Sequence, residues 1–400
     1  KTIPDGCSAD SDVGNLTVLG YHPKKYLTGR SPLEAAAMGI EMAETDAALR
    51  ANLVCLSEDE PYEEKRMIDY SGLQVCRYRP RRAVAVKVQY PGVGDAVAAD
   101  LRNADLIGLL LQQGFGGLNP DEMVAEIKER LVEELDYRLE AANQQLFADY
   151  YRGHPFIHVP EVLPTFCGAH VLTSELVDGA TWQQMLEWPQ PERDRVGEVL
   201  FRFVFRSLYG MHAFNGDPHP GNYLFHRDGR VTFLDFGLVK HFTDDEMASF
   251  IAMVKAAAFD HDIGQFRRVV EAAGMLRLGC PSPDDEIGEY FSQFYESVRE
   301  DKPVTWSSEY ASRIVRHTFD RTSPIAQYAT VPKAFVFIQR INLGLYALLG
   351  ELRASGNYRR MAEELWPFVA GPPTTPLAVA EQEWLHAAAT RDHLTRRAHG

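Results

Sequence analysis

The chain has 400 residues, of which 45% are hydrophobic and 24% charged, a composition that suffices for a large two-lobed domain or two smaller ones. Its formal net charge of −15 argues against nucleic acid as a partner, because a polyanion would be repelled. The five cysteines are scattered without a C-x-x-C pair, which indicates neither a disulfide framework nor a zinc site and fits a reducing compartment.

Residues 1–80 have the least legible pattern. We predict one helix there, at 32–53, because Ser31 can serve as N-cap before Pro32 and alanines follow. The chain begins at Lys1 without a charged-then-apolar signal pattern, so we expect a fragment or a processed product. The best candidate for a membrane span, 334–350, is interrupted by polar residues. We therefore expect a cytoplasmic location, peripheral to a membrane at most.

Residues 83–89 predict a buried strand of small and β-branched residues. Lys87 lies inside this strand, and a lysine in an apolar strand is costly to bury unless it meets an anion or reaches solvent. Strand alternation places Lys87 on the face with the smaller side chains, which leaves room for a ligand.

Two helices are predicted next, at 95–113 and 120–151, separated by a glycine-rich break. Four carboxylates share one face of the second helix: Glu129, Glu133, Asp136 and Glu140. We interpret the first two as solvated. Asp136 and Glu140 are the candidate partners of Lys87, because kinase folds supply that partner as a helix-borne glutamate.

The following elements lead the chain into a loop and then into a helical region. Residues 171–177 predict a strand that ends at a linker, which in a kinase is where backbone groups meet adenine. A helix at 191–210 is apolar nearly all round and is therefore expected to be buried. Beyond Asp245 the pattern is helical to about 369, and a loose tail is expected from Gly371 onward.

The loop at 217–222 and the segment at 234–237 have the spacing of a phosphoryl-transfer site. Asp217 and Asn222 are five residues apart, as are the catalytic Asp and the metal-binding Asn of H-R-D-x-x-x-x-N in protein kinases. An Asp-Gly turn between two apolar runs predicts a hairpin that returns the next carboxylate, Asp235, to the asparagine. Asp235 then stands where the Asp of D-F-G binds the metal.

The loop also has a simpler interpretation. Asp217 and Asn222 could cap backbone groups of an ordinary tight turn, and His219 could orient Asp217 or pack the loop. The presence of Lys87 and Asp235 in order favours nucleotide binding, whereas for His219 we favour the structural role.

Four motifs, in order, resemble the UbiB/AarF-type (ABC1) atypical kinases over about residues 83–368. They are V-A-V-K-V-Q-Y-P-G-V at 84–93, E-L-D-Y with E-A-A-N at 134–143, G-D-P-H-P-G-N at 216–222, and L-D-F-G at 234–237. The resemblance implies an α+β, protein-kinase-like two-lobed fold, with a small β-containing N-lobe that has a helical insertion and a large, mainly helical C-lobe. It also implies ATP and Mg²⁺ as cofactors.

Carried over by position, the resemblance implies that Lys87 pairs with Glu140 and contacts the nucleotide phosphates. Asp217 would be at the catalytic-base position, and Asn222 and Asp235 would hold the metal. Three residues belong to family motifs: Glu134, Asp136 and Asn143. Three further positions would contact the nucleotide: Glu175, Val177 and Leu224.

The family is linked to isoprenoid quinone (ubiquinone) biosynthesis and lipid homeostasis, and its members often associate with membranes. A small-molecule or lipid substrate is therefore expected in preference to a protein. The chain departs from the family pattern before Lys87, where no K-x-G-Q element or Ala-rich nucleotide loop is found and 71–75 is only a faint echo of S-x-G-Q-V.

The expected domains are a divergent segment at 1–80, truncated or rearranged, an N-lobe at 81–178, a C-lobe at 179–370 and a tail at 371–400. Two other functions stay open. One is a small-molecule phosphotransferase similar to aminoglycoside or choline kinases, whose loop also resembles G-D-x-H-P-G-N. The other is a catalytically silent nucleotide-binding scaffold, because the phosphate-covering loop is missing.

Overall fold

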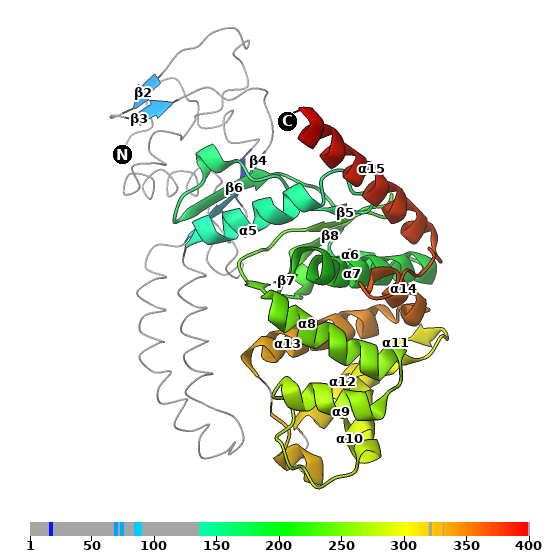
Figure 1. Ribbon diagram of the computed structural model, residues 1–400. Helices are drawn as coiled ribbons and strands as arrows, with labels where there is room; N and C mark the ends of the chain where they lie inside the picture. Colours follow the sequence, from blue (N-terminus) through cyan, green and yellow to red (C-terminus); the bar gives the residue numbers. More distant parts are fainter. Residues whose placement is uncertain are drawn as a thin grey trace. The chain divides into compact units, whose positions relative to one another are not determined.

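The computed structural model of the chain describes residues 16–18, 68–70, 73–75, 84–89, 136–319, 322–330 and 332–398 (Figure 1). These residues fall into two compact units. The described parts of 1–150, 159–178 and 234–238 form unit 1, and those of 151–158, 179–233 and 239–400 form unit 2. The helices predicted at 32–53 and 95–113, together with Glu134, lie outside the described residues.

Unit 1 is built on a three-stranded sheet in the order β1-β4-β6. β1 (Leu16–Val18) runs parallel to the central strand β4 (Val84–Val88), and β6 (Val171–Glu175) runs antiparallel to it, with Lys87 opposite Leu172. The predicted strand containing Lys87 is thereby confirmed. A separate hairpin joins β2 (Ile68–Tyr70) to β3 (Leu73–Val75).

Helix α5 (Tyr137–Tyr150) packs on β6, burying Tyr137 and Ala141 against Leu172. The single helix predicted at 120–151 is wrong at Asp136, which is not helical, and its first part, 120–135, lies outside the described residues. Its carboxylate accepts a hydrogen bond from the Arg138 N–H at 3.0 Å, as an N-cap does, and so begins the helix at Tyr137.

Unit 2 is mainly helical and contains three small sheets. Its helices are α6 (Trp182–Leu186), α7 (Gln190–Met211), α8 (Asp244–Val254), α9 (Ile263–Ala272), α10 (Asp284–Ser292), α11 (Glu296–Arg299), α12 (Ser308–Phe319), α13 (Lys333–Leu352), α14 (Tyr358–Leu365) and α15 (Pro376–Ala398). Helix α7 is buried continuously through its middle, from Val196 to Phe203, as its apolar composition predicted.

The strands of unit 2 frame the loop that holds Asp217. β8 (Tyr223–Phe225) and β9 (Val231–Phe233) form the predicted hairpin, and β5 (Ile157–His158) pairs parallel to β9. β7 (Ala213–Asn215) pairs with β10 (Val239–His241), and β11 (Val304–Thr305) pairs with β12 (Ser355–Gly356).

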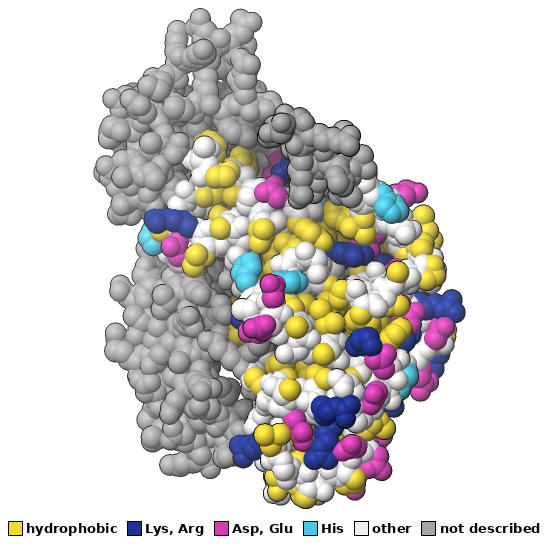
Figure 2. Space-filling view, viewed as in Figure 1, with side chains coloured by type: hydrophobic (Ala, Val, Ile, Leu, Met, Phe, Trp, Pro, Cys, Tyr) yellow, Lys and Arg dark blue, Asp and Glu magenta, His cyan; other side chains and the backbone are white. Residues whose placement is uncertain are grey.

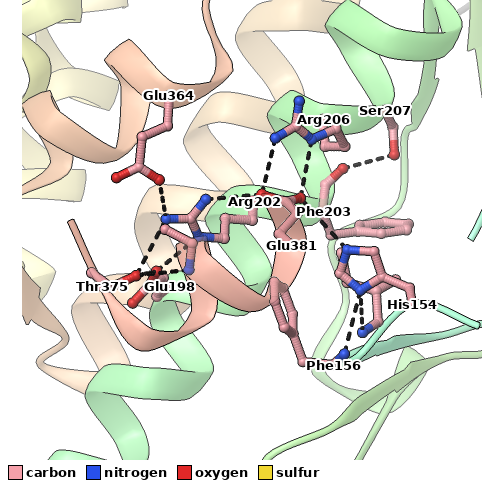
Figure 3. A network of polar contacts seen from close by, with 12 residues as sticks. His154, Phe156, Glu198, Arg202, Phe203, Arg206, Ser207, Glu364, Thr375 and Glu381 are labelled. Carbon is pink, nitrogen blue, oxygen red and sulfur yellow. Dashed lines mark hydrogen bonds and ion pairs between the residues drawn. The ribbon is translucent and has the colours of Figure 1, made fainter. Parts of the chain in front are cut away.

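A buried ion-pair network joins α7 to α15 (Figure 3). The guanidinium of Arg202 is fully buried and binds Glu198 at 2.7 Å, Glu381 at 2.9 Å and Glu364. Arg206 makes a second, bidentate contact with Glu381, at 3.0 and 2.9 Å. The loose tail expected from Gly371 is therefore wrong: after a Pro-rich turn, Thr375 caps a helix that a buried carboxylate anchors.

His154 completes this network as a neutral side chain (Figure 3). Its Nδ1 accepts hydrogen bonds from the N–H groups of Phe156 at 3.3 Å and Ile157 at 3.0 Å, and its Nε2 lies 3.5 Å from Glu381. Burial lowers the pKa of His154, although Glu381 opposes that shift. Protonation of Nδ1 would also break both main-chain hydrogen bonds.

Two short segments depart from the predicted division at 178. Residues 151–158 belong to unit 2 because β5 pairs with β9. Residues 234–238 belong to unit 1 because Asp235 and Phe236 contact Lys87 and α5.

Two features concern binding to membranes and to polyanions: the apolarity of the helices and the distribution of charge on the surface. In the part of the chain that the structure describes, none of the helices combines the length and the apolarity that crossing a bilayer requires. On the face drawn in Figure 2, basic and acidic side chains of the described residues are interspersed among apolar ones.

Candidate active site

The buried lysine of β4 is paired with two carboxylates inside unit 1. Lys87 Nζ lies 2.7 Å from both carboxylate oxygens of Glu140 and 3.3 Å from Oδ2 of Asp235. The relative exposures of the three side chains are 12%, 6% and 8%. Because a buried charge is costly unless paired, these contacts explain how an apolar strand tolerates Lys87. Of the two candidate partners, Glu140 makes the contact, and Asp136 caps the helix instead.

The cluster carries surplus negative charge. One lysine faces two carboxylates, so the formal charge is +1 − 2 = −1 when all three groups are ionised. Burial lowers the pKa of Lys87, but Glu140 and Asp235 outweigh burial and raise that pKa overall. Burial raises the pKa of Glu140 to about 7, against the opposing charge of Lys87 and with a further contribution from Asp235. A cation beside Asp235 would therefore be stabilised.

Helix α5 also fixes the Asp-Phe-Gly segment. Asn143 Nδ2 donates a hydrogen bond to the Phe236 carbonyl at 3.2 Å, and the rings of Phe147 and Phe236 lie 4.9 Å apart. Within the segment, the Gly237 N–H donates to Oδ1 of Asp235 at 2.9 Å. The helix that supplies the partner of the lysine thus also sets the position of Asp235.

Asp217 and Asn222 face each other across a short loop in unit 2. Asn222 Nδ2 donates to Oδ2 of Asp217 at 2.9 Å and to the Asp217 carbonyl at 3.1 Å. A 3₁₀ turn over Pro220–Asn222 closes the loop. Because the amide nitrogen of Asn222 is committed to Asp217, its Oδ1 is directed elsewhere and is the atom that could bind a cation.

Gly344 of α13 allows the helix to pass directly beneath this loop. A Cβ at position 344 would lie 3.0 Å from Cβ of Pro218 and closer still to its Cγ. A side chain larger than hydrogen would therefore collide with the rigid proline ring next to Asp217. The loop rests on α13 through a contact that only glycine permits.

The other predicted site residues are spread over both units. Glu175 ends β6, where its main-chain N–H donates to the Glu161 carbonyl at 2.8 Å. Val177 is half-buried in the segment after β6, and Leu224 is half-buried on β8 in unit 2. In all, Lys87, Glu140, Asp235 and Asn143 meet in unit 1, whereas Asp217 and Asn222 meet in unit 2.

Sequence reasoning missed two residues that hold the site. Tyr137 lies beneath Lys87, with Nζ 5.0 Å from the ring centroid, and Gly344 supports the catalytic loop. The three-residue spacing of Tyr137 and Glu140 could have indicated that both share the face toward Lys87. No pattern in the sequence marks Gly344, because the collision depends on a loop more than a hundred residues away.

The two predicted metal ligands have suitable chemistry for Mg²⁺. A carboxylate and an amide oxygen are hard ligands, and Mg²⁺ is commonly bound by one or two carboxylates together with substrate phosphates. No group of three or more His, Cys, Asp or Glu side chains that could hold a metal occurs among the described residues. The chemistry of these two side chains therefore fits a magnesium site whose remaining ligands are nucleotide phosphates. A metal site made by protein side chains alone is not found in the described part of the chain.

A sheet with a buried lysine, a helix-borne glutamate paired to it and an Asp-Phe-Gly segment beside both define a protein-kinase-like domain. Residues 76–270 match the family model described as the ABC1 atypical kinase-like domain. This part of the chain therefore belongs to the ABC1 atypical kinase family.

Known proteins agree with this assignment. The chain is 34% identical over 179 residues to atypical kinase COQ8B of Rattus norvegicus. The aligned region makes up 44% of this chain and 33% of that protein. A solved structure of Rv3197 with erythromycin, from Mycobacterium tuberculosis, has a TM-score of 0.64 and 26% sequence identity, covering 87% of this chain and 86% of that one. The chain spans about a third of the length of the curated relatives it matches.

The N-terminal residues match a different family. Residues 1–79 match the model of 2,3-bisphosphoglycerate-independent phosphoglycerate mutase. The chain is 34% identical over 153 residues to 2,3-bisphosphoglycerate-independent phosphoglycerate mutase 2 of Methanothermobacter thermautotrophicus. The aligned region makes up 31% of this chain and 38% of that protein. The departure from the ABC1 pattern before Lys87 thus falls where one match ends and the other begins, and the faint echo at 71–75 lies inside the mutase match.

Proposed function

We propose that the chain binds Mg-ATP and transfers its γ-phosphoryl group as an atypical kinase or ATPase of the UbiB class. The acceptor is a small molecule or a lipid, or water in the ATPase reaction, and the pathway is isoprenoid quinone biosynthesis or lipid homeostasis. Peripheral association with a membrane would give access to such a substrate.

The observation that carries this proposal is the buried cluster of Lys87, Glu140 and Asp235. Two carboxylates face one lysine in this cluster, and one of them lies on the non-helical Asp-Phe-Gly segment that α5 holds. That arrangement is expected where a lysine and a metal ligand must both face phosphate oxygens.

Each residue then has a defined task. Lys87 steadies the nucleotide phosphates, Glu140 orients Lys87, and Asp235 and Asn222 hold the metal. Bound Mg²⁺ would supply charge neutralisation at the phosphates. Asp217 accepts the proton of the acceptor hydroxyl, and the hydrogen bond from Asn222 holds its carboxylate in place for this purpose.

Phosphate release from Mg-ATP tests the proposal. The full-length chain is compared with Asp235→Asn, which keeps the shape of the side chain and removes its charge. Asp285→Asn, an exposed aspartate on α10, is the matched control. We expect release to fall to background in Asp235→Asn alone; equal rates in wild type and Asp235→Asn would favour the catalytically silent scaffold.

The acceptor needs a separate experiment. We expect lower isoprenoid quinone levels in a deletion strain, restored by the wild-type gene and not by the Asp235→Asn gene. Unchanged quinone levels with altered water-soluble phosphorylated metabolites would instead favour a phosphotransferase similar to aminoglycoside or choline kinases. The match of residues 76–270 to the ABC1 family favours the first outcome.

A further inference from the structure

His219 lies midway between the two functional residues of the catalytic loop, and its side chain is exposed. Its main chain is tied to both of them: the His219 N–H donates to the Asp217 carbonyl at 2.8 Å, and the Asn222 N–H donates to the His219 carbonyl at 2.9 Å. The main chain of His219 is therefore held in a fixed place relative to Asp217 and Asn222.

The ring itself is also oriented, although it is exposed. Its Nδ1 accepts a hydrogen bond from the Gly221 N–H at 3.0 Å. A Cβ on Gly221 would lie 3.0 Å from Nδ1 and 3.2 Å from Cε1, so the ring lies close over the glycine backbone. The hydrogen bond and the close approach, both to Gly221, orient this exposed ring.

This hydrogen bond determines which ring nitrogen carries the proton. A neutral imidazole has one donor and one acceptor nitrogen, and Nδ1 is the acceptor here. The proton is therefore on Nε2, on the side of the ring away from Gly221. The result is an oriented N–H donor on the same short loop as the proposed base and metal ligand, and phosphoryl transfer develops negative charge on oxygen beside those two groups.

We propose that the Nε2–H of His219 donates a hydrogen bond to an oxygen of the γ-phosphoryl group. This inference rests on the proposed function and adds a catalytic residue to it. In the transfer, the bond from the γ-phosphorus to the β,γ-bridging oxygen breaks and the acceptor oxygen bonds to phosphorus. The acceptor proton passes to Asp217, and His219 keeps its own proton while stabilising the phosphoryl oxygens.

A simpler role for His219 is that its ring only caps the 3₁₀ turn. Two variants separate capping by Nδ1 from donation by Nε2, because each variant keeps the function of one ring nitrogen and loses that of the other. Asparagine is a good cap residue, and in His219→Asn its Oδ1 can replace Nδ1 as the acceptor while the outward donor is lost. In His219→Gln, the longer amide can place an N–H near the position of Nε2 while the cap is lost.

The experiment measures dissociation constants for Mg-ATP and Mg-ADP in the full-length chain, which separate γ-phosphoryl contacts from all others. Because a hydrogen bond to a charged group is lost, we expect His219→Asn to bind ATP roughly tenfold more weakly and ADP equally well. His219→Gln should keep more of the preference for ATP. His261→Asn is the control, since His261 is exposed and its φ of 53° suits asparagine.

Ring ¹⁵N spectra of the wild-type protein give a second readout that needs no variant to fold. The Nε2 resonance of His219 should shift with a non-hydrolysable Mg-ATP analogue and stay in place with Mg-ADP. An unchanged ATP-to-ADP affinity ratio in His219→Asn, or an Nε2 resonance that responds equally to both nucleotides, would overturn the inference. Failure of wild-type protein to bind either nucleotide would instead overturn the proposed function.

Discussion

Replacing Gly344 by alanine tests whether α13 sets the position of the catalytic loop. The added Cβ would lie 3.0 Å from Cβ of Pro218 and closer to Cγ, whereas carbon atoms in favourable contact are about 3.5–4.0 Å apart. The proline ring cannot rotate away. The loop or the helix must therefore shift by more than about 1 Å to accommodate the methyl group.

The expected loss of stability is modest and the expected loss of activity is large. Overpacking of this kind costs about 1–3 kcal/mol, and the higher helix propensity of alanine offsets up to about 1 kcal/mol. The free energy of unfolding should fall by about 0–3 kcal/mol. A displacement of about 1 Å in a catalytic group can cost on the order of 100-fold in rate, so Gly344→Ala should be a folded and nearly inactive protein.

Urea unfolding and phosphate release from Mg-ATP measure the two effects separately. Gly264→Ala is the matched control on α9, because a Cβ there would meet nothing closer than 3.7 Å. We expect the control to keep its rate and to gain up to about 1 kcal/mol of stability from the helix propensity of alanine. If Gly344→Ala releases phosphate at the wild-type rate while Asp235→Asn does not, then the loop is not positioned by α13.

Three further predictions follow from the charges and hydrogen bonds. Lys87→Met leaves Glu140 and Asp235 facing each other in a buried site, so urea unfolding should show a loss of about 3 kcal/mol that Glu140→Gln partly restores in the double variant. Asn143→Ala removes the donor to the Asp-Phe-Gly segment, costing about 1 kcal/mol and weakening ATP-dependent thermal stabilisation. Because the pKa of buried His154 is lowered, its contribution to stability should be complete above about pH 6.5 and decline below it, by up to about 1.4 kcal/mol per pH unit.

The sign of the pH effect follows from proton binding. The unfolded chain protonates this histidine near pH 6.5, while the folded chain resists protonation down to the lowered pKa, so acid favours unfolding in that window. His154→Asn removes the titration and should flatten the difference between pH 7.5 and 5.5. An equal pH dependence in that variant would contradict the role given to His154. Additive losses of stability in the Lys87→Met and Glu140→Gln double variant would contradict the coupling of that pair. An unchanged ATP-dependent thermal shift in Asn143→Ala would contradict the role of its hydrogen bond.

Much of the fold near the site was predictable because the determining interactions are local. An Asp-Gly turn between apolar runs gave the β8–β9 hairpin, and the apolar composition of 191–210 gave the buried helix α7. The two errors are also local in origin. Asp136 hydrogen-bonds the start of α5, and the Pro-rich stretch before Thr375 obscured the helix that Thr375 caps.

The site was predictable only where chemistry dictates residue type and spacing. Lys87, Asp217, Asn222 and Asp235 could be named as candidates because phosphoryl transfer needs those groups at those separations. The choice of Glu140 over Asp136 depended on where a helix begins, which an N-cap decides. Gly344 could not be found at all, since its role depends on a close approach between segments distant in sequence.

Arg202 shows why a buried charge alone does not identify an active site. Like Lys87, it is a cation in an apolar segment and is surrounded by carboxylates. The carboxylate partners of Arg202 all lie on helices and occupy its Nε and both terminal nitrogens, which leaves it as an anchor for α15. One partner of Lys87 lies instead on the non-helical Asp-Phe-Gly segment, where a cation and a phosphate could approach. A charge within an apolar run therefore predicts burial and pairing, and only the order of the accompanying motifs separates the catalytic case from the structural one.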